Sequence, residues 1–289
     1  MGSGSFSTSA YASYSTSTGR SYDAVTGRTS GQSFRSIRLN AALNPAKFEF
    51  RECCNSDEHP NTIPVILALD VTGSMGSACK ECADALGVIM TNLYKKFKDI
   101  EFCIMGIGDL AYDNAPIQMS QFESDVRIAE SLDKVWLEGG GGGNAYESYT
   151  AAWYMGLYRT KLDCFDKQSR KGIIITMGDE PLNPYLPVSE LSHTLNTTLQ
   201  GDVETEDLYQ EASKKFEIFH IAVDDKHTCY DGYKKEIEHS FGKLLGNHYK
   251  VSTIQQLAKT IEECISEAVN TEITDMPSEV QVTNGEISW

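Results

Sequence analysis

The segment that most constrains the fold is residues 63–76, with the sequence IPVILALDVTGSMG. Its first seven residues form a continuous apolar run, which is typical of a strand buried on both faces of a sheet. The run ends in Asp70, and Thr72 and Ser74 follow at alternate positions, beside glycines at 73 and 76. Three oxygen-bearing side chains are therefore expected around the carboxyl end of one strand. Hard divalent cations prefer oxygen ligands, so the segment predicts a metal site.

The rest of the chain alternates buried strands with helices. Strands are expected at 100–107, 117–122, 172–177, 216–223 and 249–251, and helices at 76–97, 124–135, 145–158, 233–245 and 254–268, with another ending at 215. This alternation predicts a mostly parallel sheet covered on both faces. Ligands of such sheets bind outside the carboxyl ends of the strands, where the strand order reverses. Asp70 and Asp179 each follow a strand, so both are expected at one site.

A run of five glycines, residues 139–143, precedes Asn144. Because glycine has no Cβ, another backbone, a metal site or a ligand can approach this loop closely. Asn144 is predicted to open the helix at 145–158, whose first backbone N–H groups point back at the loop. Asp109 and Asp113 follow the strand at 100–107 and either surround the same site or form a solvated turn; the turn is the simpler interpretation.

The pattern Asp70-x-Thr72-x-Ser74, with its two glycines, resembles the metal-ion-dependent adhesion site of von Willebrand factor A (vWA) domains, with threonine in place of one serine. The resemblance covers residues 62–270. It implies an α/β, three-layer, Rossmann-like fold with a mostly parallel central sheet, one antiparallel edge strand and helices on both faces. It also implies that Asp70, Thr72 and Ser74 are metal ligands, although the two hydroxyls could instead cap the helix that follows.

Two further ligands are implied by the same resemblance. In vWA domains a second loop usually supplies a threonine; here that loop offers Asn144, with Glu147 and Ser148 one helical turn further on. A third loop supplies an aspartate, which is Asp179 here, displaced by one residue from the usual Thr-Asp-Gly-Glu order. Glu180 is expected near the site without contacting the metal, or in solvent.

The resemblance implies a protein-binding module and not an enzyme. Mg²⁺, or Mn²⁺ or Ca²⁺, would be bound by the chain, and a carboxylate of a partner protein would complete its coordination. Similar intracellular vWA proteins commonly work beside AAA+ ATPases of the MoxR type, so such a partner is implied.

Two other functions stay open. The chain could be a self-assembling structural protein that forms homo-oligomers through its Ser/Tyr/Gly-rich segment 1–38. It could also be a metal-dependent phosphohydrolase of the haloacid-dehalogenase type. That chemistry needs a second acid two residues after the first, and this chain has Thr72 there.

Composition limits the classes of partner and the cellular location that are expected. With 25 basic and 41 acidic residues the net charge is −16, which argues against nucleic acid and anionic membranes as partners. The sequence contains no apolar run of roughly 18–20 residues, the length of a transmembrane helix. The segment MGSGSF lacks the features of a signal peptide, so a cytoplasmic location with eight reduced cysteines is expected. The pairs Cys53-Cys54 and Cys79-x-x-Cys82 could bind zinc, but buried free thiols are the favoured interpretation.

The chain divides into four parts. Residues 1–38 form an arm that alone should be flexible, because it has few aliphatic residues to bury. Residues 39–61 are a lead-in segment that packs against the domain edge. Residues 62–270 are the vWA-like domain, and residues 271–289 are an acidic C-terminal tail.

Overall fold

The computed structural model describes residues 4–140 and 146–275, and its centre is a six-stranded sheet. The spatial order is β12-β11-β8-β4-β5-β6, and every pair is parallel except β5 with β6 at one edge. The strands are β4 (Ile63–Asp70), β5 (Ile100–Ile107), β6 (Ile117–Met119), β8 (Gly172–Gly178), β11 (Phe216–Val223) and β12 (Tyr249–Ser252). This sheet confirms the predicted α/β class, with a mostly parallel central sheet and one antiparallel edge strand.

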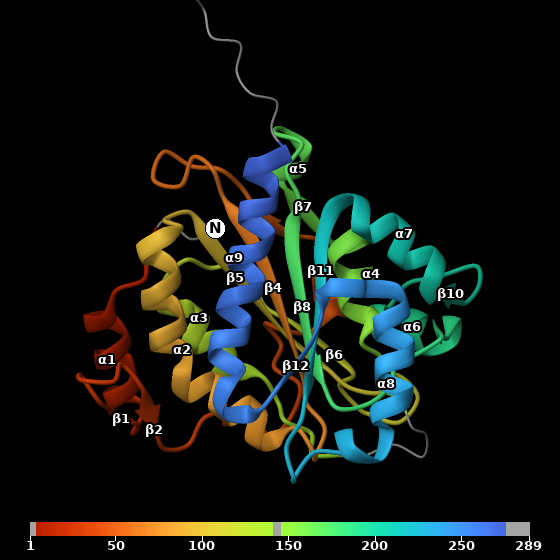
Figure 1. Cartoon of the computed structure of the whole chain (residues 1–289), viewed down its shortest axis with the longest axis horizontal. Coiled ribbons are helices and arrows are strands. Elements are labelled where there is room, and N and C mark those ends of the chain that lie inside the picture. Colours follow the sequence, from red (N-terminus) through yellow and green to blue (C-terminus); the bar gives the residue numbers. More distant parts are fainter. Residues whose placement is uncertain (1–3, 141–145, 276–289) are drawn as a thin grey trace, which may run out of the picture.

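Helices cover both faces of the sheet (Figure 1). Alternate residues of β4 enter two separate cores: Val65, Leu67 and Leu69 face one, and Ile66 and Ala68 face the other. The first core is closed by α2 (Gly76–Lys96), α3 (Arg127–Lys134) and α9 (Leu257–Asp275). The second is closed by α4 (Thr150–Arg159), α6 (Val188–Leu195), α7 (Thr205–Lys215) and α8 (Tyr230–Leu245). Because both faces of β4 pack against a core, successive residues are apolar, which explains the continuous apolar run.

Short elements complete the described chain. Two small sheets pair β3 (Arg51–Cys53) with β7 (Thr160–Leu162) and β9 (Tyr185–Leu186) with β10 (Val203–Glu204). After residue 38, the other helical pieces are α5 (Asp163–Asp166), η1 (Pro45–Lys47), η2 (Gly246–His248) and η3 (Ile254–Gln256). No helix among residues 4–140 and 146–275 is long and apolar enough to cross a membrane.

Apart from one edge strand, the predicted strands of the central sheet match the observed ones closely, whereas several helix starts differ. The helix expected at 145–158 begins at Thr150, because the backbone of Glu147 pairs with Leu182 in an isolated β-bridge. The helix expected at 124–135 begins at Arg127, whose N–H is accepted by the Asp125 carboxylate at 3.0 Å. The predicted edge strand 117–122 is β6, which ends at Met119.

The segment predicted as an arm lies on the domain. It forms α1 (Thr8–Ser17), β1 (Ser21–Tyr22) and β2 (Thr29–Ser30), beside α2 in Figure 1. Tyr11 is fully buried and donates a hydrogen bond to the Ala83 carbonyl of α2 at 3.2 Å. Arg28 forms two bonds with the Glu81 carboxylate, at 2.9 and 2.6 Å. Contacts with the domain therefore supply the burial that the arm lacks by itself.

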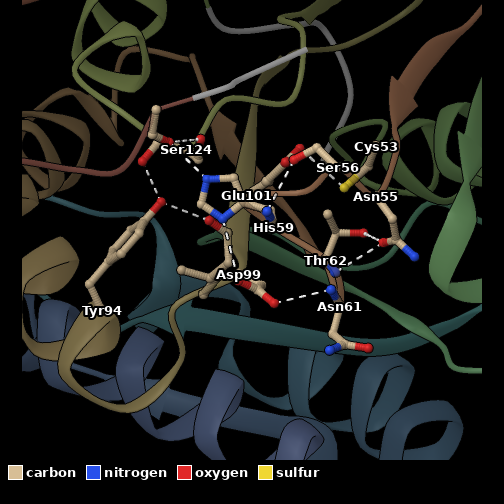
Figure 2. A network of polar contacts seen from close by, with 12 residues as sticks. Cys53, Asn55, Ser56, His59, Asn61, Thr62, Tyr94, Asp99, Glu101 and Ser124 are labelled. Carbon is tan, nitrogen blue, oxygen red and sulfur yellow. Dashed lines mark hydrogen bonds and ion pairs between the residues drawn. The ribbon is translucent and has the colours of Figure 1, made fainter.

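A polar network fixes the lead-in segment to the amino ends of β4 and β5 (Figure 2). The ring of His59 contacts the Gly4 carbonyl at 3.0 Å and the Asp99 carboxylate at 3.4 Å. The buried Cys53 thiol donates to the Glu101 carboxylate at 3.2 Å. This network lies at the end of the sheet opposite Asp70, because β4 and β5 are parallel.

The cysteines of the suggested zinc site lie in different cores. Cys53 belongs to the core under α4, whereas Cys79 and Cys82 belong to the core under α2. All eight cysteines are free. The sheet therefore separates Cys53 from Cys79 and Cys82, and these three are buried free thiols as interpreted, whereas Cys54 is only partly buried.

We expect Gly87→Ala to release the arm. A Cβ at position 87 would lie 2.6 Å from both the Gly27 carbonyl oxygen and the Tyr11 ring. Overpacking of this kind costs about 1–3 kcal/mol, which corresponds to a roughly 5- to 150-fold larger population of the open arm. Limited trypsin digestion should therefore cleave faster after Arg20 and Arg28.

Gly242→Ala is the matched control, because position 242 is also helical and its Cβ would meet nothing within 4 Å. Equal cleavage of the Gly87 variant and the control would contradict the packing of the arm on α2.

Candidate metal centre

The two predicted acidic ligands lie at one edge of the sheet. β4 and β8 are adjacent and parallel, with Leu69 opposite Met177. Asp70 ends β4 and Asp179 directly follows β8. From β4 the chain continues to β5 on one side of the sheet, whereas from β8 it continues to β11 on the other. The acids therefore meet at the reversal in strand order, where ligands of such sheets bind.

Asp70 is fully buried and held by three donors. Its Oδ1 accepts hydrogen bonds from the Thr72 backbone N–H at 2.9 Å and from the Thr72 hydroxyl at 2.5 Å. Its Oδ2 accepts a bond from the Tyr149 hydroxyl at 2.8 Å. Burial raises the pKa of Asp70 to about 7, and the nearby charge of Asp179 adds to this effect.

The hydroxyls of Thr72 and Ser74 interact with the two acids and do not cap the helix that follows. The residue that caps α2 is Met75, and no side chain makes a capping hydrogen bond there. The Thr72 hydroxyl bonds to Asp70, and a hydrogen-bonding interaction with Ser74 acts on the Asp179 carboxyl. The helix-capping alternative for these two residues is therefore not what the structure shows.

Asp179 is fully buried and only partly satisfied. Its Oδ2 accepts a bond from the Cys229 backbone N–H at 2.6 Å, whereas its Oδ1 has no hydrogen-bond partner among the described residues. Burial raises the pKa of Asp179. Cys229 precedes α8, so a third segment of the chain contributes to the site.

The displaced order of the third loop has a steric reason. A Cβ at Gly178 would lie 2.0 Å from the Tyr149 hydroxyl oxygen, so the side chain of Tyr149 fills the space at the end of β8. Glycine is required there, and the acid follows one residue later. Sequence reasoning placed Tyr149 inside a helix and missed this role; the displaced glycine was its only sequence signal.

The second loop approaches the first, and Asn144 itself lies outside the described residues. The Gly73 N–H donates to the Gly140 carbonyl at 3.0 Å, and the Gly139 N–H donates to the Val71 carbonyl at 3.3 Å. A Cβ at Gly73 would lie 3.2 Å from the Gly139 oxygen, so the glycines allow the close approach. Beyond the loop, the Ser148 hydroxyl accepts a bond from the Leu110 N–H at 3.0 Å. Both ends of the loop are thus anchored near the site.

Further buried or partly buried carboxyl groups lie close enough to interact electrostatically with these residues. Glu147 is 2% exposed, and burial together with the charge of Asp70 raises its pKa to about 11. Asp109 is 4% exposed; its Oδ1 accepts a bond from the Ala111 N–H at 2.8 Å, as in the predicted turn. Burial and the charge of Asp179 raise the pKa of Glu180 to about 7. The predicted turn therefore also lies in the acidic environment of the site.

The arrangement fits a divalent cation. The buried carboxyl oxygens without a hydrogen-bond partner in the described part of the chain include Asp109 Oδ2, Glu147 Oε2 and Asp179 Oδ1 at this end of the sheet, besides others on Asp84, Glu123 and Asp133. Within that part, no group of three or more His, Cys, Asp or Glu is arranged to hold a metal ion. The predicted ligand set has only two such residues, Asp70 and Asp179, and takes its other oxygens from hydroxyls. Mg²⁺ commonly combines one or two carboxylates with water in this way.

Comparisons with known proteins yield distant structural likenesses. No protein-family model matches the sequence, and no curated protein matches it. The chain is similar to the pilus adhesin SpaC from Lactobacillus rhamnosus GG in its open conformation, with 12% identity and a TM-score of 0.48 over 75% of this chain and 31% of that one. It is also similar to the vWF domain of the type V pili tip protein Mfa5 from Porphyromonas gingivalis, with 13% identity and a TM-score of 0.43 over 76% of this chain and 98% of that one. The chain thus spans about a third of the SpaC structure.

We expect Gly178→Ala to destabilise the protein. The added methyl group would collide with the fully buried Tyr149, and overpacking in such a position costs about 1–3 kcal/mol or more. Urea unfolding followed by circular dichroism measures the change in the free energy of unfolding. Gly201→Ala, where a Cβ would meet nothing within 4 Å, is the control and should leave stability nearly unchanged.

Proposed function

We propose that this protein is a metal-dependent protein-binding module whose site is the cluster of Asp70, Thr72, Ser74 and Asp179. Asn144 belongs to the proposed ligand set through its sequence position. Mg²⁺, or Mn²⁺ or Ca²⁺, is the proposed ion, and when bound it would offer a carboxylate of the partner protein an open coordination position.

The side chains of the chain itself have distinct proposed roles. Asp179 offers the unpartnered Oδ1 as a direct ligand atom, and Ser74 lies beside it. Thr72 holds Asp70 through its backbone and its hydroxyl, so the orientation of this carboxylate is set before any ion arrives. Preorganised ligands lower the cost of binding because little conformational freedom is lost.

One observation carries the proposal: Asp70 and Asp179 are fully buried side by side, and one of their oxygens lacks any described partner. Burying like-charged carboxyls costs free energy unless a positive charge compensates. A cation supplies that charge, whereas a purely structural role leaves the burial of the two acids without compensation.

The other two functions receive less support. For a haloacid-dehalogenase-type phosphohydrolase, the position of the general acid is Thr72, whose hydroxyl is bonded to Asp70. For assembly through the arm, Tyr11 and Arg28 are already bonded to the same chain. A binding module is therefore the function we favour. A MoxR-type AAA+ ATPase as its partner and a cytoplasmic location stay predictions.

We expect Mg²⁺ to raise the thermal unfolding midpoint of the wild-type protein but not that of Asp179→Asn. An ion that binds only the folded state stabilises it by about 2.7 kcal/mol at a hundredfold excess over its Kd.

Without metal, Asp179→Asn should be at least as stable as wild type, because the repulsion between two buried acids is removed. Glu211→Gln, on the surface of α7, is the control and should respond to Mg²⁺ like wild type. Equal responses of all three proteins would overturn the proposed site.

We also expect partner binding to need both the metal and Asp70. Affinity capture from a cell lysate would use wild type, Asp70→Ala and Glu211→Gln as baits, each with Mg²⁺ or with a chelator. Wild type and the Glu211 variant should retain a common protein in Mg²⁺ and lose it with chelator, and the Asp70 variant should not retain it. Retention that is insensitive to both changes would contradict the proposal.

A further inference from the structure

Tyr149 connects the two halves of the proposed metal site. It directly precedes α4 and is fully buried. Its hydroxyl donates to Asp70 Oδ2 at 2.8 Å and accepts a bond from the Glu180 backbone N–H at 3.3 Å. A single oxygen atom therefore bridges the acid that ends β4 and the loop that carries Asp179.

The position of that oxygen is tightly constrained. The Tyr149 ring packs against His220 of β11, with ring centroids 5.2 Å apart, and against Phe241 of α8 at 5.8 Å. On the side of β8, the missing Cβ of Gly178 leaves just enough space for the phenol. Because three elements enclose the ring, the hydroxyl stays fixed relative to both strand ends.

The contacts of Asp70 give this fixed hydroxyl a specific effect. Thr72 donates two hydrogen bonds, both to Oδ1, whereas Oδ2 accepts its hydrogen bond from Tyr149. Donors on both oxygens fix the rotation of the carboxylate about its Cβ–Cγ bond. Without Tyr149, Oδ2 would be a fully buried acceptor with no such donor. Hydrogen-bond partners of a ligating side chain set its orientation and thereby the affinity of the site for the metal.

We infer that Tyr149 is a positioning residue of the metal centre, whose hydroxyl orients Asp70 and ties it to the loop of Asp179. This inference rests on the proposed function. It assigns to Tyr149 a role that the Asp70-x-Thr72-x-Ser74 pattern does not contain. It also accounts for the displaced third loop, because Gly178 and Tyr149 fit together as a pair.

Tyr149→Phe tests the inference, because it removes the hydroxyl and keeps the ring. Isothermal titration calorimetry with Mg²⁺, repeated with Mn²⁺, measures the Kd. We expect affinity about 10- to 100-fold weaker than that of wild type. Tyr11→Phe is the matched control: it also removes a fully buried phenol hydroxyl, but from the arm, and should keep the wild-type Kd.

A second pair of variants separates positioning from folding. At position 149, 4-aminophenylalanine restores a hydrogen-bond donor, whereas 4-methylphenylalanine fills the same space without one. Tight metal binding should return only with the amino group. If wild type binds the metal and the Phe and methyl variants bind it equally well while folded, the role of Tyr149 is overturned and the proposed function stands. If wild type binds neither Mg²⁺ nor Mn²⁺, the proposed function fails, and the inference fails with it.

Discussion

The burial of Asp70 beside Asp179 is the constraint on which the rest of the site depends. Each acid is placed by a strand that is apolar on both faces, so neither can turn towards solvent without disturbing a core. The surrounding carboxyls of Glu147 and Glu180 have raised pKa values, chiefly because they are buried. Concentrating acids in this way costs free energy unless a positive charge compensates. Such a cost in stability is typical of residues that bind a ligand and do more than stabilise the fold.

Much of the fold could be predicted because its strands carry a strong periodic signal. β4 is a continuous apolar run and β5 and β11 are largely apolar, and their predicted limits agree with the structure within a residue. Helix starts were less predictable. α4 begins later than expected because Glu147 takes part in a β-bridge with Leu182, a contact between segments that local sequence does not reveal. Parallel pairing then brings Asp70 and Asp179 together, so two of the predicted site residues could be placed from topology alone.

The remainder of the site depends on packing, which a single sequence does not show. The arm, which lies outside the site, shows the same limit: its composition predicts flexibility, yet Tyr11 packs against Gly87 and Arg28 pairs with Glu81. The same applies to Tyr149, whose aromatic type fits an ordinary core residue. Its role follows only from the distance of its hydroxyl to Asp70 and from the space left at Gly178.

The two ends of the sheet also differ in how their polar groups are satisfied. At the amino ends of β4 and β5, the buried Glu101 carboxylate accepts a bond from Cys53, and Asn55 accepts two bonds from Thr62 (Figure 2). At the carboxyl ends, Asp179 keeps an oxygen without a partner in the described chain. Both ends belong to the same strands and bury acids to a similar depth, so burial alone does not explain the difference. The chain itself supplies donors to Glu101 and Asn55, whereas the open oxygen of Asp179 suits the proposed cation.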